Sequence, residues 1–494
     1  MKVLLLEHPR SYGEDRCNDI ANAPLSACLN TGYIGGMLAS KNIDVTIVDA
    51  YLEKLDYPQI EAEIARIRPT ILGIHLVYHW ENNQTLYQFI EHVKATYGIS
   101  YVTVYGFYPT FAYEEILNRC PAIDSALLGE TELTFLKLVE NFPNQELQGI
   151  AYRKDGGITA SRGEIMMEVD ALPFPLRSKG SYSFGEVNIA GSRGCYGGCT
   201  FCYINPYYGE AKRKWRGRSP ENIAAEIDAI MKETEIRYFY FVDPNFFGPG
   251  NAGKDRVLKL AALLKERNIT FGIEARVNDI EEQTVAALVD AGLRHILIGL
   301  ESGRDESLKR LNKLTSVSDN EKALRILRKY GIEPSVGFIM FEPDSTIEDL
   351  KINYDFLKRN DLLEKLEISV NVLYHHMIIL QGSASYKALQ DQGRLNISDH
   401  STYEADTDYQ NPKVATMAGM MRDMTNHIFA YMKDTWELSF KKDPATLSQY
   451  DLVNRLLVYS FAGLLNEFES GEMTAENRDI YVRSFNQSVD LIMS

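Results

Sequence analysis

Three cysteines crowd into a short glycine-rich stretch near the middle of the chain, and thiolates placed so closely are typical of a shared metal centre. They are Cys195, Cys199 and Cys202. The glycines that let the backbone turn tightly around a ligand are Gly191, Gly194, Gly197 and Gly198. Soft thiolates select zinc, copper(I) or iron–sulfur clusters. Structural zinc needs a fourth ligand, and no paired Cys-x-x-Cys or His-x-x-x-His follows. A four-iron cluster with one open iron therefore fits better; three unligated thiols are the alternative.

The cysteine spacing, directly after a predicted strand at 186–191, resembles the signature of the radical S-adenosylmethionine (SAM) enzymes. The resemblance implies that Cys195, Cys199 and Cys202 hold three irons of a [4Fe–4S] cluster, while SAM chelates the fourth. One electron from the cluster then cleaves SAM to methionine and a 5′-deoxyadenosyl radical, which abstracts a substrate hydrogen. An aromatic residue before the third cysteine usually packs near the adenine, and Phe201 holds that place here.

Residues at the ends of later predicted strands extend this resemblance over roughly residues 186–345. The resemblance assigns SAM contacts to Asp243, Asn245, Arg276, Glu301, Ser302 and Ile339. Asp243 and Asn245 lie in a stretch similar to the second-strand motif of the family branch that carries a cobalamin domain. Taken singly, Glu301 or Arg276 reads equally well as half of a surface ion pair. Their order behind the cysteine loop favours one shared site.

The first 141 residues alternate short apolar strands with amphipathic helices. This alternation predicts a doubly wound (Rossmann-like) parallel sheet, in which ligands lie beyond the C-terminal ends of the strands. The predicted strands are 3–6, 45–48, 71–77, 101–105 and 125–128, and the predicted helices are 28–40, 57–67, 82–96, 111–118 and 131–141. This segment resembles the cobalamin-binding domain that precedes many radical SAM barrels.

The residues at the expected cobalamin crevice depart from that resemblance. The third strand runs into Ile74–Trp80 and the fourth into Tyr105–Pro109, where small residues usually leave room for the cofactor. Each aromatic side chain adds roughly 150–250 Å² of surface that competes for this space. No Asp-x-His-x-x-Gly stretch supplies a lower cobalt ligand. His75 and His79 are the remaining candidates, with a core or surface position as the alternative. We predict that the fold is kept without cobalamin; bound cobalamin is the alternative.

A second alternating series predicts a central partial (β/α)6 barrel of the TIM type. Its strands are expected at 186–191, 237–243, 270–275, 295–300, 333–340 and 366–373, and its helices near 219–233, 252–267, 280–291, 319–330 and 345–359. Turn-rich residues before it predict a connector with a small hairpin. Helical patterns at 414–436 and 447–468 follow it, the first with methionines that indicate core packing. The predicted units are a Rossmann-like domain 1–141, a connector 142–185, the barrel 186–380 and a mainly helical region 381–494.

Candidate substrate residues lie on the last predicted barrel strand and beside the cysteines. Glu367, Ser369 and Asn371 would share one strand face, which points either into the barrel or to solvent. Tyr203 follows the third cysteine and is a further candidate, with packing around the loop as the alternative. The basic run 212–218 suits an anionic substrate or an electron donor, or else it is a solvated loop.

Length, composition and charge bound the functional class. A chain of 494 residues should hold about three compact units. Asp and Glu number 68 against 52 Lys and Arg, and the net charge of −16 argues against a nucleic-acid binder. No apolar run reaches the roughly 20 residues of a membrane helix. Because the start reads as a strand and cysteines are few, we expect a cytoplasmic protein.

These features together predict a radical SAM enzyme that acts on a small molecule, such as a sugar or a natural-product intermediate. The expected outcome is rearrangement, dehydration or reduction without cobalamin. Its partner would be a reducing protein such as flavodoxin or ferredoxin. A cobalamin-dependent radical SAM C-methyltransferase is one alternative. A non-catalytic iron–sulfur redox sensor is another, and it would need neither the SAM residues nor a substrate cleft.

Overall fold

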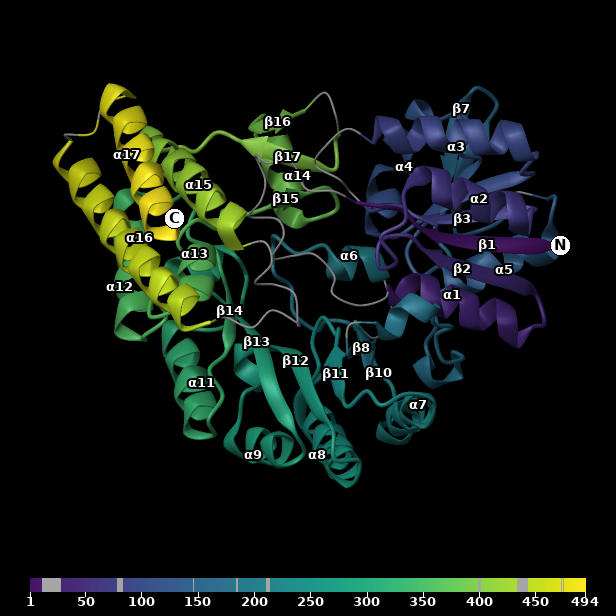
Figure 1. The fold of residues 1–494 in the computed structure, drawn as a ribbon, viewed down its shortest axis with the longest axis horizontal. Coiled ribbons are helices and arrows are strands. Elements are labelled where there is room, and N and C mark those ends of the chain that lie inside the picture. Colours follow the sequence, from purple (N-terminus) through teal and green to yellow (C-terminus); the bar gives the residue numbers. More distant parts are fainter. Residues whose placement is uncertain are drawn as a thin grey trace.

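The computed structural model describes residues 1–10, 28–77, 83–144, 146–183, 185–209, 214–398, 401–432, 443–471, 473 and 475–494. The N-terminal sheet with its helices lies at one end of the molecule and three long C-terminal helices lie at the other, with a second sheet between them (Figure 1). Among the described helices, none combines the length and the apolar character that a membrane crossing requires.

The first domain is built on a seven-stranded sheet in the order β2-β1-β3-β4-β5-β6-β7. The strands are β1 Lys2–Glu7, β2 Asp44–Asp49, β3 Ile71–His75, β4 Tyr101–Tyr105, β5 Ser125–Leu127, β6 Ile150–Lys154 and β7 Gly157–Ala160. Strands β1 to β5 are parallel, and β6 and β7 add to them antiparallel. The helices are α1 Leu29–Ser40, α2 Tyr57–Ile67, α3 Gln84–Tyr97, α4 Phe107–Arg119 and α5 Glu132–Asn141.

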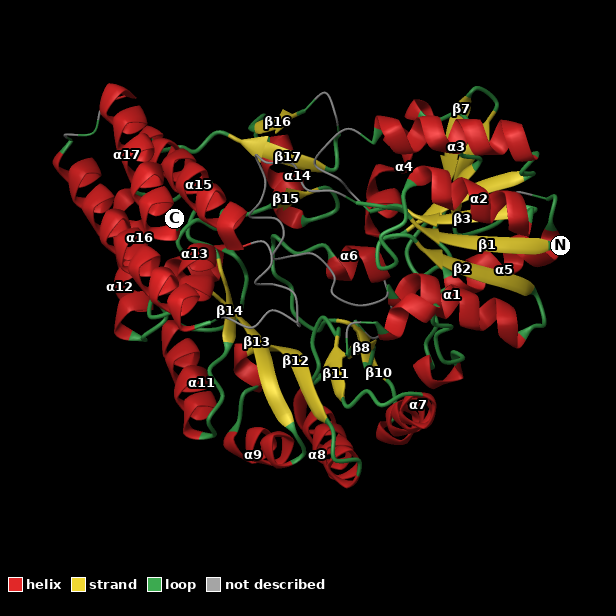
Figure 2. Ribbon diagram, viewed as in Figure 1, coloured by secondary structure: helices red, strands yellow, loops and turns green. Residues whose placement is uncertain are grey.

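Helices cover both faces of this sheet, as unbroken apolar strands require. In β1, Val3 and Leu5 pack with α1 and α5, whereas Leu4 and Leu6 pack with α2, α3 and α4. All four side chains are buried, so the alternation along one strand supplies two cores. Figure 2 shows the helices on either side of the sheet. The predicted doubly wound architecture is confirmed.

The hairpin expected after the first domain is present and extends its sheet. Strands β6 and β7 pair around a turn at Asp155 and Gly156, whose φ angles are 52° and 79°. Gly and Asp adopt these left-handed conformations more readily than other residues. The chain then passes through the short helical turns η2 Val169–Ala171 and η3 Lys179–Tyr182 to the second sheet.

The second sheet has five parallel strands in the order β14-β13-β12-β11-β8. The strands are β8 Glu186–Ile189, β11 Tyr238–Phe241, β12 Thr270–Arg276, β13 Leu293–Glu301 and β14 Ser335–Phe338. The helices that follow them are α7 Pro220–Glu233, α8 Gly250–Glu266, α9 Glu282–Asp290, α10 Asp305–Arg310, α11 Val317–Lys329 and α12 Ile347–Arg359. After β8, a two-stranded ladder of β9 Ser192–Gly194 and β10 Trp215–Gly217 flanks the short helix α6 Ile204–Tyr208. The TIM-type alternation is confirmed.

The sixth predicted strand, 366–373, is wrong, because these residues form the helix α13 Leu366–Val372. The apolar residues of this segment also fit the spacing of a helix, because Leu366 and Val370 are one helical turn apart and both are buried. Helix α13 packs against α16 Pro444–Ser470, and this distant contact overrides the local strand preference. The sixth barrel position is taken by a single parallel bridge between Phe341 and His376.

The C-terminal region contains a small sheet that the sequence did not predict. It has the order β15-β17-β16, with β15 Ile379–Leu380, β16 Leu395–Ile397 and β17 Glu404–Thr407. Strands this short carry too little periodicity to be recognised. The remaining helices are α14 Ala384–Asp391, α15 Pro412–Met432 and α17 Ala475–Met493. The methionines of α15 are completely buried, which confirms their core role; they are Met417, Met420, Met421 and Met424.

Candidate active site

The cysteine loop connects β9 to α6 and is held by side-chain amides on both sides. Asn205 Nδ2 donates to the Gly197 carbonyl at 2.5 Å, and Asn312 Nδ2 donates to the Gly198 carbonyl at 2.6 Å. The Gly197 N–H donates to Cys195 Sγ at 3.3 Å. Burial raises the pKa of Cys202 to about 11, and the neighbouring Cys199 and Cys195 add to this. Bound metal would reverse this, since a cation holds thiols deprotonated.

Arg276, at the end of β12, places a positive charge against the cysteine loop. Its Nη1 lies 3.5 Å from Cys199 Sγ, and Nη2 donates to the Lys313 carbonyl. A side chain at Gly197 would meet the Arg276 guanidinium, since an added Cβ would lie 2.2 Å from Nη1. Arg276 Nε is buried without a hydrogen-bond partner among the described residues. Three free thiols, a backbone donor to sulfur and this unsatisfied cation fit an anionic iron–sulfur cluster.

Asp243 and Asn245 contact the β9–β10 ladder from the end of β11. Asp243 Oδ2 accepts from the Gly191 N–H at 3.0 Å, and burial raises the pKa of this carboxyl to about 6. The Asn245 backbone carbonyl accepts from Trp215 Nε1 at 2.8 Å and from the Ser192 hydroxyl at 3.2 Å. Asp243 Oδ1 and Asn245 Nδ2 are buried with no hydrogen-bond partner in the described part of the chain. Both residues therefore position the ladder from which the cysteine loop starts.

Glu301 ends β13 in a conformation that few residues adopt. Its φ is 65°, which is strained for a residue other than glycine. Its Oε1 accepts from Lys313 Nζ at 2.6 Å, and its carbonyl accepts from the Ile339 N–H at 2.7 Å. The adjacent Ser302 is completely buried, and its hydroxyl donates to Asn353 Oδ1 at 2.8 Å. The Ser302 hydroxyl thus holds the turn after β13.

An apolar cluster faces the other side of the cysteine loop. Phe201 packs against it, and Ile339 belongs to it together with Met377 and Ile379. The structure thus brings together Phe201, which the resemblance assigned to the adenine, and Ile339, which it assigned to SAM, although the two are far apart in sequence. The loop is fastened here too, since the Thr200 N–H donates to the Leu311 carbonyl at 3.0 Å.

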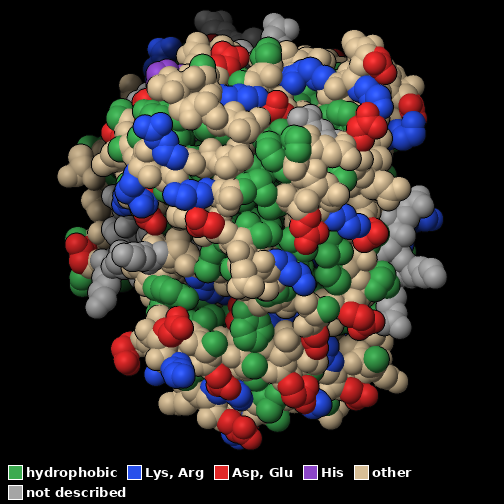
Figure 3. Space-filling view, turned by 90° about the vertical axis from the view of Figure 1, so that its right-hand side faces the viewer, with side chains coloured by type: hydrophobic (Ala, Val, Ile, Leu, Met, Phe, Trp, Pro, Cys, Tyr) green, Lys and Arg blue, Asp and Glu red, His purple; other side chains and the backbone are tan. Residues whose placement is uncertain are grey.

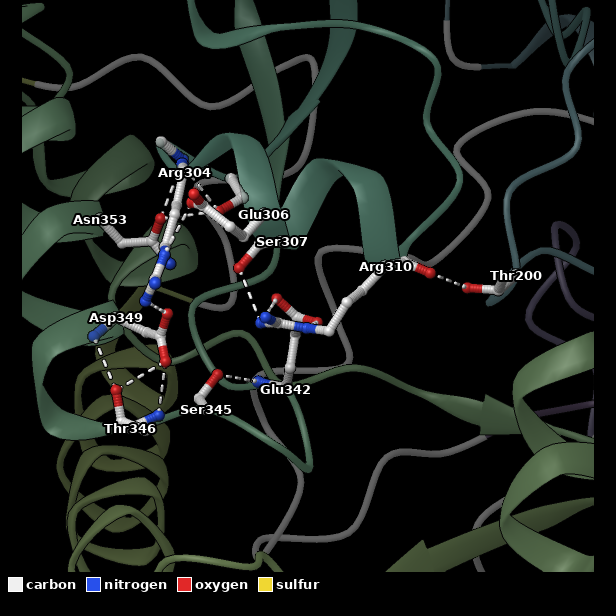
Figure 4. A network of polar contacts seen from close by, with 12 residues as sticks. Thr200, Arg304, Glu306, Ser307, Arg310, Glu342, Ser345, Thr346, Asp349 and Asn353 are labelled. Atoms are coloured by element: carbon white, nitrogen blue, oxygen red, sulfur yellow. Dashed lines mark hydrogen bonds and ion pairs between the residues drawn. The ribbon is translucent and has the colours of Figure 1, made fainter.

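A polar network supports this side of the loop (Figure 4). Arg310 lies 3.2 Å from Glu342 Oε1, and its carbonyl accepts from the Thr200 hydroxyl at 3.5 Å (Figure 4). Glu342 is buried, and burial raises the pKa of its carboxyl although Arg310 opposes this. Asp349 accepts from Thr346 and from Arg304 in the same network. The network ties the segment after β13 to the one after β14.

Aromatic rings join the edge of the first sheet to helix α6. Phe107 lies 4.9 Å from the Tyr203 ring and 4.2 Å from the Tyr207 ring, and Phe111 also contacts Tyr203. Tyr105 and Tyr108 turn into the two cores of the first domain instead, where both are buried. Among the described aromatic residues at positions 105, 107 and 108, Phe107 is thus the one whose ring contacts the tyrosines beside the cysteine loop. His79 lies outside the described residues.

The prediction that Glu367, Ser369 and Asn371 share a strand face is wrong. In the helix α13, Glu367 and Asn371 are one turn apart, and Asn371 Nδ2 donates to the Glu367 carbonyl at 2.8 Å. Ser369 is completely buried on another side of the helix. The three side chains therefore form no common surface.

The two arginines at the end of the basic run are not solvated. Arg216 and Arg218 are buried, and they pair with Glu130 and Glu226, whereas Lys214 is exposed. Lys212 and Arg213 lie outside the described residues. On the face of the N-terminal domain, acidic and basic side chains are interspersed in the described part (Figure 3). Arg216 and Arg218 thus bind carboxylates within the protein, and no local sequence pattern indicates these partners.

A pocket of about 190 Å³ opens beside β14 and the small C-terminal sheet. His376 and Met377 line it from the bridge after α13, Asp406 and Thr407 from β17, and Arg422 from α15. Sequence reasoning missed this pocket because part of its lining comes from the small sheet, which was not predicted, and its packing against the predicted helix at 414–436 is a tertiary contact. Met377 belongs to the apolar cluster of Phe201 and Ile339, so the pocket adjoins the site.

Part of the chain is similar to a known family, and most of it to several known proteins. Residues 189–357 match the model of the Radical SAM superfamily. An uncharacterized methyltransferase of Pyrococcus horikoshii is 27% identical over 380 residues, which cover 73% of this chain and 79% of the relative. The anaerobic magnesium-protoporphyrin IX monomethyl ester cyclase of Rubrivivax gelatinosus is 28% identical over 345 residues, which cover 65% of this chain but 60% of the cyclase.

Among solved structures, the cobalamin-dependent SAM radical enzyme OxsB, with aqua-cobalamin and SAM bound, superposes with a TM-score of 0.80. The match covers 100% of this chain and 79% of OxsB at 19% sequence identity. At this identity the likeness establishes the fold, which therefore extends over the sheet domain, the barrel and the C-terminal region.

Proposed function

We propose that this chain, whose residues 189–357 match the Radical SAM superfamily model and whose fold is shared by a cobalamin-dependent SAM radical enzyme, is a radical SAM enzyme that cleaves SAM reductively and abstracts hydrogen from a small molecule. Rearrangement, dehydration or reduction of the substrate follows, without bound cobalamin. The substrate class is a sugar or a natural-product intermediate, and a flavodoxin or ferredoxin supplies the electron.

Cys195, Cys199 and Cys202 hold the cluster in this proposal. A [4Fe–4S] cluster held there would supply the electron for the reductive cleavage of SAM. Arg276, beside Cys199 Sγ, offsets the negative charge of the thiolates. The buried polar atoms of Asp243 and Asn245 stay available for SAM or for the loop that contacts it.

Glu301 and the apolar cluster orient SAM. The Glu301 carboxylate is fixed by Lys313 and is suited to the SAM ammonium group. Phe201 and Ile339 offer an apolar slot to the adenine. The pocket lined by His376, Asp406 and Arg422 offers charged and polar groups to a hydroxylated substrate. The half-buried Tyr203 ring lies against Phe107 and Phe111, so it serves packing in this proposal.

The observation that carries the cobalamin-free reaction is the contact of Phe107 with Tyr203 and Tyr207. The three rings fill space between the edge of the first sheet and α6, on the side where doubly wound sheets bind ligands. A cofactor there would have to displace three large rings. Gly106, with φ of 120°, adds to this tightness because an added Cβ would lie 2.8 Å from the His75 ring.

Cobalamin-dependent C-methyl transfer is the second candidate. A relative whose printed name is a methyltransferase favours it, as does the full-length fold match to a cobalamin-bound enzyme. In that reaction the rings of Phe107, Tyr203 and Tyr207 would have to move apart to admit the cofactor.

The deciding experiment reconstitutes the cluster anaerobically and supplies SAM and dithionite, with and without hydroxocobalamin. We expect 5′-deoxyadenosine and methionine in both samples, and a corrin absorbance band that does not stay with the protein on gel filtration. The Cys199→Ala variant should produce neither product. No 5′-deoxyadenosine with any substrate would favour a redox sensor. Stoichiometric retained cobalamin would favour the methyltransferase.

A further inference from the structure

Three metal-ligand side chains meet at the edge of the first sheet, on elements separate from the cysteine loop. Glu7 ends β1, His75 ends the neighbouring β3, and Cys28 immediately precedes α1. Their ligand atoms all lie within 4.8 Å of one another. Parallel strands bring their C-terminal ends to one edge, which is where doubly wound sheets place their ligands.

The donor atoms converge on a single nitrogen. His75 Nδ1 lies 3.0 Å from Glu7 Oε2 and 3.3 Å from Cys28 Sγ. Tetrahedral zinc, with bonds of about 2.0–2.3 Å, separates neighbouring ligand atoms by roughly 3.4–3.6 Å. Small shifts would therefore admit an ion. Cys28 Sγ also lies 3.9 Å from His75 Nε2, so Nδ1 is the nearer ring nitrogen for the thiol as it is for the carboxylate, whereas a catalytic relay would set the two groups on opposite ring nitrogens.

The surrounding side chains orient the carboxylate for this role. The Thr31 hydroxyl donates to Glu7 Oε1, and the Tyr105 hydroxyl lies 2.9 Å from Thr31 Oγ1. Oε2 is thereby left on the side of His75. Glu7 is 2% exposed and His75 is 9% exposed. Outer hydrogen bonds that fix a ligating group in this way are typical of protein metal sites.

A basic side chain competes with a metal ion for the carboxylate. Arg10 Nη2 donates to Glu7 Oε2 at 2.6 Å, and this is the same oxygen that lies 3.0 Å from His75 Nδ1. A metal ion would compete with Arg10 for this oxygen, and its binding would release the protons held by the ligand side chains.

We propose that Glu7, Cys28 and His75 form a second metal site, which binds a zinc ion or a similar divalent ion that prefers thiolate and imidazole. They supply three of the four ligands that zinc takes in proteins. The site is distinct from the thiols of the cysteine loop. It is also independent of which reaction the barrel catalyses.

The test uses the full-length chain with Cys195, Cys199 and Cys202 replaced by alanine, so that zinc cannot bind to the cluster thiols. Zinc is added, the excess is removed and the bound metal is measured by mass spectrometry. A parallel sample takes cobalt(II). We expect one zinc per chain and a thiolate-to-cobalt charge-transfer band. Both are lost in Cys28→Ala. The control Cys120→Ala removes a buried thiol of the same domain that lies outside the cluster, and it keeps both signals.

A variant outside the ligand set separates metal binding from folding. Thr31→Val removes the hydroxyl that orients Glu7, and we expect zinc affinity to fall about 10–100-fold. Circular dichroism confirms that each variant folds, and zinc should raise the melting temperature of the parent but not of Cys28→Ala. Zinc content unchanged in Cys28→Ala, or a folded parent without stoichiometric zinc, overturns the proposal.

Discussion

Replacing Glu130 with alanine should loosen the attachment of the first domain to the cysteine loop. Glu130 follows β5 in the first domain, whereas Arg193 and Arg216 lie in the ladder that flanks the loop. Glu130 Oε2 accepts from Arg193 at 3.1 Å, and Oε1 accepts from Arg216. All three residues are at most 7% exposed, so water screens these charges little. Arg193 keeps Glu132 in the variant, but Arg216 loses its carboxylate and keeps the Met166 carbonyl.

The expected magnitude follows from this burial. Leaving a buried cation without its partner costs about 3–5 kcal/mol. An exposed pair contributes about 0–1 kcal/mol. The matched control is therefore Glu146→Ala, which breaks the 2.7 Å ion pair between Glu146 and Lys154. The Glu146 side chain is 65% exposed and the Lys154 side chain 41% exposed. Glu130→Gln keeps the shape of the side chain and one acceptor oxygen, so the stability that it loses should lie between the losses expected for Glu130→Ala and Glu146→Ala.

Urea unfolding of the reconstituted protein measures the effect. Fluorescence of Trp215, which lies beside Arg216 in β10, reports on the ladder, and iron content reports on the cluster. We expect Glu130→Ala to lower the unfolding midpoint and to release iron at lower urea than the control. If Glu130→Ala and Glu146→Ala unfold at the same midpoint, the buried network does not stabilise this attachment and the reasoning fails.

Further predictions concern the cluster, the aromatic contact and a buried carboxyl. Cys199→Ala should lose most of the cluster iron, whereas Cys120→Ala should keep it; equal iron contents would contradict the ligand assignment. Phe107→Ala should cost about 1–3 kcal/mol, because the ring is half-buried, and should raise cobalamin retention in gel filtration. Unchanged stability would show that the contact with Tyr203 is not formed. Burial raises the pKa of Asp243 from 3.8 to about 6, so the folded state keeps a proton that the unfolded chain releases. The free energy of unfolding should therefore fall by up to about 3 kcal/mol between about pH 4 and pH 6, and Asp243→Asn should remove this fall. A fall that persists in the variant would assign it to another group.

Much of the fold could be read from local patterns. The strands and helices of the first domain lie within a few residues of their predicted bounds, because fully buried parallel strands are apolar throughout and their helices are amphipathic. The prediction of a strand at 366–373 was wrong because the short apolar pattern of this segment fits a strand and a helix equally well. Its contact with α16, some eighty residues later, decided between them.

The candidate site likewise has a part that the sequence predicts and a part that depends on tertiary contacts. Cys195, Cys199 and Cys202 are close in sequence, so their spacing alone predicts convergence on one centre. Arg276 and Ile339 were assigned by resemblance, and the structure places them at the cysteine loop and in the cluster that Phe201 contacts. The pocket lined by Asp406 and Arg422 gave no signal, because no local pattern relates a short strand to a helix that packs near it.

By itself, the sequence determined the class of chemistry and the alternation of elements, since both depend on neighbours within a few residues. The tertiary structure decided which charges are paired and which ligands meet. Arg216 reads as part of a solvated basic run until the fold buries it against Glu130. Glu7, Cys28 and His75 come from three elements. They converge because parallel strands end at one edge, a consequence of sheet topology that no spacing along the chain reveals.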